Sequence, residues 1–197
     1  METAILVRHA ESEYSARALM NGDVGVDVRL TERGREQARE LGDGLRQTRL
    51  DLCATSALVR ALETADLALA GSDVPRLVLP DLNDPLYGRF EAAPLDDYRA
   101  WAAASPASAA PEGGGESRVA IVVRYARAFR TLLARTDETI LVVCHSLPIA
   151  YALAARDGTP PSAREPLAEY VRPYPFTAAQ LERAAAVLEA WAGAPNW

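Results

Sequence analysis

The chain has only two histidines, and both directly follow apolar runs that are typical of buried strands. His9 comes after the run 4–7 and Arg8, and His145 comes after the run 139–144. Near neutral pH an imidazole can serve as a nucleophile, as an acid or base, or as a metal ligand. A lone histidine is more often a structural residue, but two at equivalent positions favour shared chemistry.

Two arginines are placed to join the histidines. Arg8 adjoins His9, and Arg60 lies one turn into a predicted helix that follows the second predicted strand. A guanidinium binds phosphate oxygens through two parallel hydrogen bonds, so this set of residues fits an anionic substrate. All 21 basic residues are arginine, which excludes Schiff-base chemistry and a lysine-bearing phosphate loop.

Short runs rich in Val, Ile and Leu alternate with longer helical patterns along the chain. The predicted strands are 4–7, 50–54, 77–79 and 139–144. This alternation is typical of a three-layer α/β/α sandwich around a mainly parallel sheet, here in one domain spanning residues 1–197. Ligands of such folds bind beyond the carboxyl ends of the strands, where both histidines are expected.

Capping residues predict where several helices begin. Thr31 and Ser56 are expected to cap two helices, and a third helix is predicted over 118–135. Thr177 and Gln180 form a capping box ahead of a C-terminal helix. The buried stripe predicted for the third helix consists of Val122, Ala126, Phe129 and Leu133.

The formal net charge of −6 argues against a general affinity for nucleic acid, and no apolar run reaches the length of a membrane span or signal peptide. An anionic substrate would therefore need a local positive pocket. Cys53 and Cys144 lack the spacing of a metal site, which predicts buried thiols in a reducing compartment. We expect a cytoplasmic protein, and no pattern predicts its oligomeric state.

Five blocks of the sequence resemble the motifs of the histidine phosphatase superfamily, the phosphoglycerate mutase-like proteins. The first block, Leu6-Val7-Arg8-His9-Ala10-Glu11-Ser12, resembles the signature that carries the nucleophile in that family. The other blocks follow in the family's order at 30–38, 55–65, 82–88 and 142–146. Any one block alone is a weak signal, but the ordered set covers residues 4 to about 155, most of the chain.

The resemblance implies a metal-independent phosphatase that uses no cofactor and acts on a small phosphorylated metabolite. It makes His9 the nucleophile, and it makes Arg8 and Arg60 the ligands of the non-bridging oxygens. It assigns His145 to contact and stabilise the phosphoryl group, and Asp84 to protonate the leaving oxygen and then to activate water. Two guanidiniums beside His9 would disfavour its protonated ring and keep a lone pair free.

Three positions depart from the usual pattern of the family. Many relatives have glutamate where this chain has Asp84, so Asp81 and Glu91 remain rival candidates for the acid. Ala10 replaces a glycine after the nucleophile, and its methyl group would crowd a phosphate unless the backbone angle is ordinary. Ser15 stands where many relatives place a phosphate-contacting asparagine, and we expect its hydroxyl to donate one hydrogen bond to the substrate.

Other functions stay open. A phosphoglycerate mutase must hold a substrate carboxylate, and the corresponding stretch 92–117 has Arg99 as its only basic residue. A catalytically silent phosphate-binding or signalling module would usually lack one of the histidines or arginines, all of which are present here. A metal site built on the two histidines is a weaker hypothesis.

The identity of the phosphoester cannot be predicted from these motifs. Specificity is expected in the loops 21–29, 85–98 and 105–117, and the last of these is interpreted either as a mobile lid or as a plain connection. Four aromatic residues form either an apolar wall for the leaving group or ordinary packing: Tyr14, Tyr87, Phe90 and Tyr98.

Overall fold

In the computed structural model, which describes residues 1–197, strands and helices alternate as predicted. The strands are β1 (Thr3–Arg8), β2 (Leu52–Thr55), β3 (Arg76–Val78), β4 (Thr139–Cys144) and β5 (Pro173–Thr177). They form one sheet in the order β3-β2-β4-β1-β5, in which only the edge strand β5 runs antiparallel to its neighbour. The predicted α/β fold around a mainly parallel sheet is confirmed.

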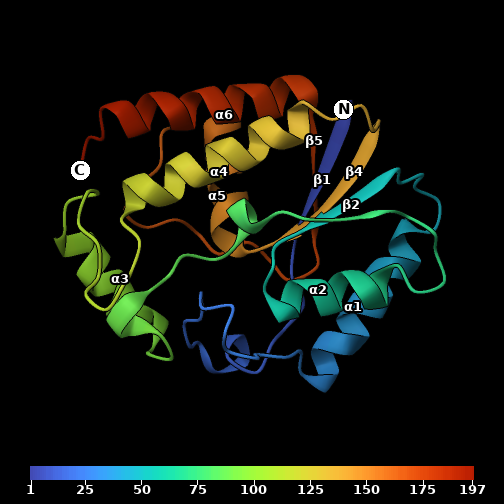
Figure 1. Cartoon of the computed structure of the whole chain (residues 1–197), viewed down its shortest axis with the longest axis horizontal. Coiled ribbons are helices and arrows are strands. Elements are labelled where there is room, and N and C mark those ends of the chain that lie inside the picture. Colours follow the sequence, from blue (N-terminus) through green and yellow to red (C-terminus); the bar gives the residue numbers. More distant parts are fainter.

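Helices cover both faces of the sheet and complete the three layers (Figure 1). The helices are α1 (Glu32–Leu45), α2 (Val59–Ala68), α3 (Leu95–Ala104), α4 (Arg118–Leu133), α5 (Ser146–Arg156) and α6 (Ala178–Gly193), with short 3₁₀ turns η1 (Ser15–Arg17), η2 (Pro80–Leu82) and η3 (Gly88–Phe90). Successive residues of a strand point to opposite faces of the sheet, so they pack into two different hydrophobic cores. In β1, Ala4 and Leu6 pack with α4, α5 and α6, whereas Ile5 and Val7 pack with α1 and α2.

Two of the predicted helix caps are confirmed and one is wrong. The Thr31 side chain accepts a hydrogen bond from the Gly34 N–H, and Thr177 and Gln180 form the expected capping box. Ser56 does not cap α2, because the helix begins only at Val59, with Leu58 in the N-cap position. The Ser56 hydroxyl is engaged elsewhere, in a contact that belongs to the candidate site.

The segments 95–104 and 173–177 form α3 and β5, neither of which was predicted, and α4 ends at Leu133. In α4 the fully buried residue of the last turn is Leu132 rather than the predicted Leu133. The segment 105–117 is irregular, as expected of a loop or connection, but one of its residues packs in the core. Ala107 is fully buried, and its N–H donates to the Trp197 carbonyl at 3.0 Å.

Strand register brings the two histidines to one edge of the sheet. Arg8 at the end of β1 lies opposite Cys144 at the end of the parallel strand β4. His9 continues this pairing, because its N–H donates to the Cys144 carbonyl at 2.9 Å. Thr55 at the end of β2 pairs with Val143 on the other side of β4, so α2 also starts at this edge.

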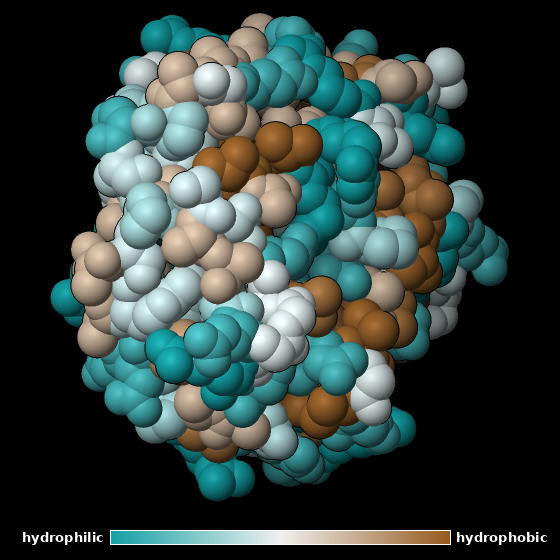
Figure 2. All heavy atoms as spheres, turned by 60° about the vertical axis from the view of Figure 1, so that its left-hand side comes forward, coloured by the Kyte–Doolittle hydropathy of each residue, from teal (hydrophilic) through white to brown (hydrophobic).

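The outer surface carries its hydrophobic side chains in several separate patches. Figure 2 shows brown hydrophobic groups divided by teal hydrophilic ones on the face that it presents. None of the helices combines the length and the hydropathy that a membrane-crossing segment requires.

Candidate active site

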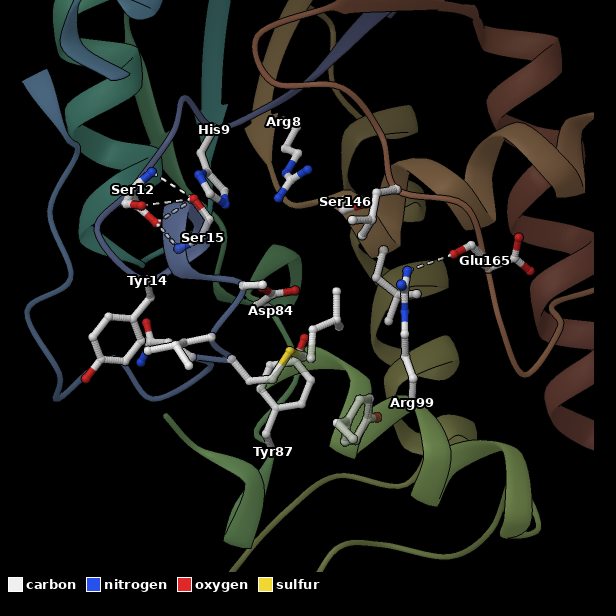
Figure 3. Close-up of a pocket in the computed structure, with 18 of the residues that line it drawn as sticks. Arg8, His9, Ser12, Tyr14, Ser15, Asp84, Tyr87, Arg99, Ser146 and Glu165 are labelled. Carbon is white, nitrogen blue, oxygen red and sulfur yellow. Dashed lines mark hydrogen bonds between the residues drawn. The ribbon is translucent and has the colours of Figure 1, made fainter. Parts of the chain in front are cut away.

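A cavity of about 160 Å³ lies beyond the carboxyl ends of the central strands (Figure 3). Arg8 and His9 enter it from the end of β1, and Arg60 enters it from the start of α2. Five arginines line the cavity against only two carboxylates, although the whole chain is acidic. These are Arg8, Arg60, Arg99, Arg118 and Arg164, with Asp84 and Glu165. The local positive pocket that an anionic substrate requires is therefore present.

The His9 imidazole is held in one orientation and one tautomer. Its Nδ1 lies 2.7 Å from the Ala10 carbonyl oxygen, which can only accept, so Nδ1 carries the proton. The opposite nitrogen, Nε2, accepts a hydrogen bond from Arg60 Nε at 3.2 Å. Burial, and then the guanidiniums of Arg60 and Arg8, hold the pKa of His9 well below its ordinary value. Nε2 therefore offers a lone pair at neutral pH.

Arg60 is the hub of the site. Its Nη1 donates to Asn21 Oδ1 at 2.6 Å, and its Nη2 donates to the Asn21 carbonyl at 2.8 Å. Nη2 also pairs with Asp84 Oδ2 at 3.1 Å. These bonds, together with a side chain that is only 4% exposed, fix the guanidinium plane beside His9.

Arg8 has a buried donor without a partner. Its Nη1 donates to the Ala168 carbonyl at 2.8 Å, and its guanidinium carbon lies 4.0 Å from the centre of the Tyr170 ring. Its Nε is buried and has no hydrogen-bond partner. Because buried donors are almost always paired in native structures, this nitrogen suits an acceptor supplied by a ligand.

Asp84 is the candidate acid that the cavity contains. Burial raises the pKa of its carboxyl, while the charges of Arg60 and Arg8 oppose that rise. The rival Asp81 does not line the cavity and is bound to Arg127 at 2.5 Å. Glu91 does not line it either, because its carboxylate accepts from the N–H groups of Gly22 and Tyr87.

His145 lies behind the cavity wall rather than in it. The ring is fully buried, and its centre is 5.2 Å from that of His9. Nδ1 lies 3.4 Å from Arg60 Nη2 and 3.7 Å from Asp84 Oδ2, and Nε2 lies 2.8 Å from the Ser56 hydroxyl. Burial, and then Arg60, lower the pKa of His145 well below its usual range, so the ring is neutral.

The two unusual residues near the nucleophile have clear surroundings. Ala10 has no positive φ, and its methyl group belongs to a small core cluster with Leu30 and Ala38, so it does not line the cavity. Ser15 does line the cavity, where its hydroxyl accepts from the Ser12 N–H at 2.8 Å (Figure 3). The same hydroxyl lies 3.0 Å from that of Ser12, so the two serines form a pair at the cavity edge.

The predicted specificity elements are only partly at the cavity. Tyr14, Tyr87 and Tyr98 line it, whereas Phe90 packs behind them with its ring centre 5.7 Å from that of Tyr98. No residue of 105–117 lines the cavity, so this segment is not a lid over it in the structure. The irregular segment that does line the cavity is 163–167.

Sequence reasoning missed several residues of the site. Asn21 falls only in a predicted specificity loop, because the pair Asn21-Gly22 resembles an ordinary turn. Ser56 is predicted only as a helix cap. Tyr170 and Arg118 carried no recognisable signal, since their positions depend on how distant segments pack.

The comparisons with known proteins agree with this geometry. The model of the histidine phosphatase superfamily (branch 1) matches residues 4–192. The chain belongs to this superfamily. The adenosylcobalamin/alpha-ribazole phosphatase of Salmonella typhimurium is 35% identical over 167 residues, which cover 80% of each chain. The crystal structure of the alpha-ribazole phosphatase from Shigella flexneri superimposes with a TM-score of 0.74 at 26% identity, covering 88% of this chain and 89% of that one.

Mutases of the superfamily are also similar to the chain. The 2,3-bisphosphoglycerate-dependent phosphoglycerate mutase of Methylobacterium sp. (strain 4-46) is 34% identical over 173 residues, which cover 78% of this chain and 80% of the mutase. The predicted family and its phosphoglycerate mutase-like fold are thus confirmed. Hydrolysis of phosphoric monoesters is the activity that the comparisons support better, since the phosphatase relatives match both in sequence and in structure.

Proposed function

We propose that the chain hydrolyses small phosphorylated metabolites through a phosphohistidine intermediate on His9. The observation that carries this proposal is the state of the His9 ring. Its Nε2 has a lone pair, lies at the cavity and is 3.2 Å from a guanidinium that phosphate would also bind. A carboxyl group with a raised pKa lies at the same guanidinium.

In the first step, phosphate oxygens replace His9 and Asp84 as acceptors for Arg60. Arg8 Nε gains the acceptor that it lacks. His9 Nε2 then attacks phosphorus, and the bond between phosphorus and the alcohol oxygen breaks. Asp84 gives its proton to that departing oxygen. Preorganised guanidiniums favour this step because charge spreads over the equatorial oxygens in the transition state.

In the second step, water attacks the phosphohistidine and the phosphorus–nitrogen bond breaks. Asp84, now ionised, takes a proton from the attacking water. Inorganic phosphate leaves, and His9 is again neutral, with its Nδ1–H donating to the Ala10 carbonyl. The Ser15 hydroxyl lines the cavity and donates to the Ser12 carbonyl at 3.1 Å, and a phosphate oxygen would replace that carbonyl as its acceptor.

His145 supports this cycle through its two tautomers. Without substrate, Nδ1 faces the Arg60 donor at 3.4 Å, so the proton is assigned to Nε2 and donated to Ser56. The Ser56 hydroxyl can instead donate to Nε2, which would leave a proton on Nδ1 for a phosphate oxygen. A neutral His145 can therefore become a donor when the phosphoryl group arrives, and Ser56 makes this possible.

Further features belong to the proposal. The relatives named as alpha-ribazole phosphatases suggest a phosphorylated metabolite with a sizeable organic part. Two buried free thiols, Cys53 and Cys144, suit the reducing environment of the cytoplasm. The arginine-rich cavity supplies positive charge without a metal ion, so we expect metal-independent turnover, without a cofactor or a nucleic-acid partner.

The test compares the wild-type protein with His9→Ala on p-nitrophenyl phosphate and a panel of phosphorylated metabolites. We expect turnover by the wild type alone, unchanged by EDTA, and a radiolabelled phosphoenzyme that survives alkali but not acid. Equal turnover by both proteins contradicts the proposal. Formation of 2-phosphoglycerate from 3-phosphoglycerate with a bisphosphate primer would instead support the mutase, to which the Methylobacterium relative points.

A further inference from the structure

Arg118 is a buried cation in the wall of the catalytic cavity that has no anionic partner. It is the first residue of α4 and only 7% exposed, and no carboxylate oxygen lies within 4.0 Å of its guanidinium. Its only hydrogen bond runs from Nη1 to the Tyr151 hydroxyl at 3.0 Å. Its Nε is buried without a partner.

A second arginine of the same helix shows how this fold satisfies a buried guanidinium that has a structural role. Arg124 donates to both carboxylate oxygens of Glu116 and to the carbonyls of Asp81 and Asn83. Arg118 has none of these partners, although it cannot lose its proton. Burying an unpaired charge is costly, so the acceptors that Arg118 lacks are expected to come from whatever fills the cavity.

Arg99 adds to the unmatched charge. Its Nη2 reaches only the Glu165 carbonyl, at 3.5 Å, and the carboxylate of Glu165 is bound to the Ser162 N–H instead. In Figure 3, Arg99 lies on the opposite side of the cavity from Ser12 and Ser15. A phosphoryl group bound by Arg8 and Arg60 at the nucleophile would leave Arg99 and Arg118 without an anion.

A row of aromatic rings connects the acid to Arg118. The Tyr87 hydroxyl is one of the groups that oppose the rise in the pKa of Asp84. The Tyr87 ring meets the Tyr98 ring edge-on, with 4.8 Å between the ring centres. The guanidinium carbon of Arg118 lies 5.2 Å from the centre of the Tyr98 ring. A leaving group that departs at Asp84 can therefore lie along these tyrosines with its far end at Arg118.

We propose that Arg118, supported by Arg99, binds a second anionic group on the leaving-group part of the substrate. The substrate is then a phosphomonoester that also carries a carboxylate or a second phosphate. This inference rests on the proposed function, since it assigns the leaving group to this end of the cavity. Arg118 acts here as a specificity-determining residue and takes no part in the chemical step.

The test uses substrates in matched pairs that differ in the second anion. The pairs are 4-carboxyphenyl phosphate with 4-carbamoylphenyl phosphate, 3-phosphoglycerate with glycerol 3-phosphate, and 6-phosphogluconate with glucitol 6-phosphate. Fructose 1,6-bisphosphate with fructose 6-phosphate tests a second phosphate. The pairs span different spacings, and each compares kcat/KM between wild type and Arg118→Gln.

We expect the wild type to favour the doubly anionic member of at least one pair. In Arg118→Gln, kcat/KM for that member should fall about ten- to hundredfold, the usual range for a lost hydrogen bond to a charged group, and that for the neutral partner should change little. Arg118→Lys should restore part of the preference, because it restores the charge. Arg46→Gln, at a mostly exposed arginine outside the cavity, is the matched control.

Two results would overturn the inference. One is an equal loss on both members of every pair, which would mean that Arg118 only supports Tyr98 and Tyr151. The other is the absence of any preference that depends on Arg118. Calorimetry separates this question from catalysis: it measures the binding of the same pairs to His9→Ala, once with Arg118 present and once with Arg118→Gln in the same chain. A doubly anionic compound that binds more tightly only when Arg118 is present supports the inference even if no hydrolysis is found.

Discussion

Replacing Asp84 with asparagine removes its proton-donating role and keeps its contact with Arg60. The carboxyl lines the cavity, its Oδ2 pairs with Arg60 at 3.1 Å, and burial raises its pKa. Asparagine has nearly the same size and can still accept from Arg60 through its oxygen. It cannot deliver a proton to a leaving alkoxide, so Asp84→Asn should remove acid catalysis while keeping the site assembled.

The size of the effect follows from the leaving group and from exposure. General acid catalysis contributes about 10²–10⁴-fold, and the Asp84 side chain is 19% exposed, so water can replace part of it. We therefore expect kcat/KM for glycerol 3-phosphate to fall by about 10²–10³-fold, in the lower part of that range. p-Nitrophenolate leaves without a proton, so kcat/KM for p-nitrophenyl phosphate should fall by far less.

The assay adds a rapid-quench measurement of the phosphoenzyme. Because Asp84 also activates water, Asp84→Asn should hydrolyse the phosphohistidine slowly and release a burst of p-nitrophenolate. The substitution also removes a negative charge beside Arg60, so KM should not rise. Asp81→Asn, at the rival carboxyl outside the cavity, should behave as the wild type. An equal loss of kcat/KM on both substrates, with no burst, would refute the assignment.

Three further predictions follow from the same contacts. The pKa of His9 is lowered and that of Asp84 is raised, so kcat/KM should rise with pH as His9 loses its proton and fall as Asp84 loses its proton, and a pH profile without the falling limb would contradict the assignment of Asp84 as the acid. Ser56→Ala should lower kcat about tenfold with little change in KM, because the buried His145 Nε2 loses its partner, and steady-state kinetics would reveal an unchanged kcat if Ser56 has no such role. Gly34→Ala should lower the free energy of unfolding by about 1–3 kcal/mol, since a Cβ there would meet the Glu11 carbonyl at 2.0 Å, whereas Gly44→Ala in the open part of α1 should raise it by up to about 1 kcal/mol; urea unfolding would test this opposite pair of signs.

The parts of the fold that could be predicted from sequence depend on local patterns. The buried run 139–144 forms β4 with the predicted bounds. The Thr31 and Thr177 caps lie where predicted, because each depends on a contact with the residue three positions later. The edge strand β5 was missed because two of its five residues are prolines, which normally argue against a strand. These prolines are tolerated because β5 is an edge strand that pairs only with β1.

The candidate site was predictable to the extent that strand ends determine it. His9 and His145 follow parallel neighbours in register, so their proximity follows from topology alone. The different environments of the two rings do not follow from topology. His145 lies behind the cavity and contacts Ser56 because α2 begins only at Val59, which leaves the Ser56 hydroxyl free of a capping role. The sequence wrongly predicts Ser56 as the cap of that helix.

Arg118 illustrates a limit of reasoning from helical periodicity. An arginine in the first turn of a helix is expected to face water, where its long side chain costs little. Here Tyr98 from α3 and Tyr151 from α5 enclose it, and neither contact has a counterpart in the sequence near Arg118. Arg124 lies six residues later in the same helix and is matched by Glu116. Burial alone therefore does not distinguish the structural role of Arg124 from the ligand-binding role proposed for Arg118, and the acceptors that Arg118 lacks are the observation that suggests the difference.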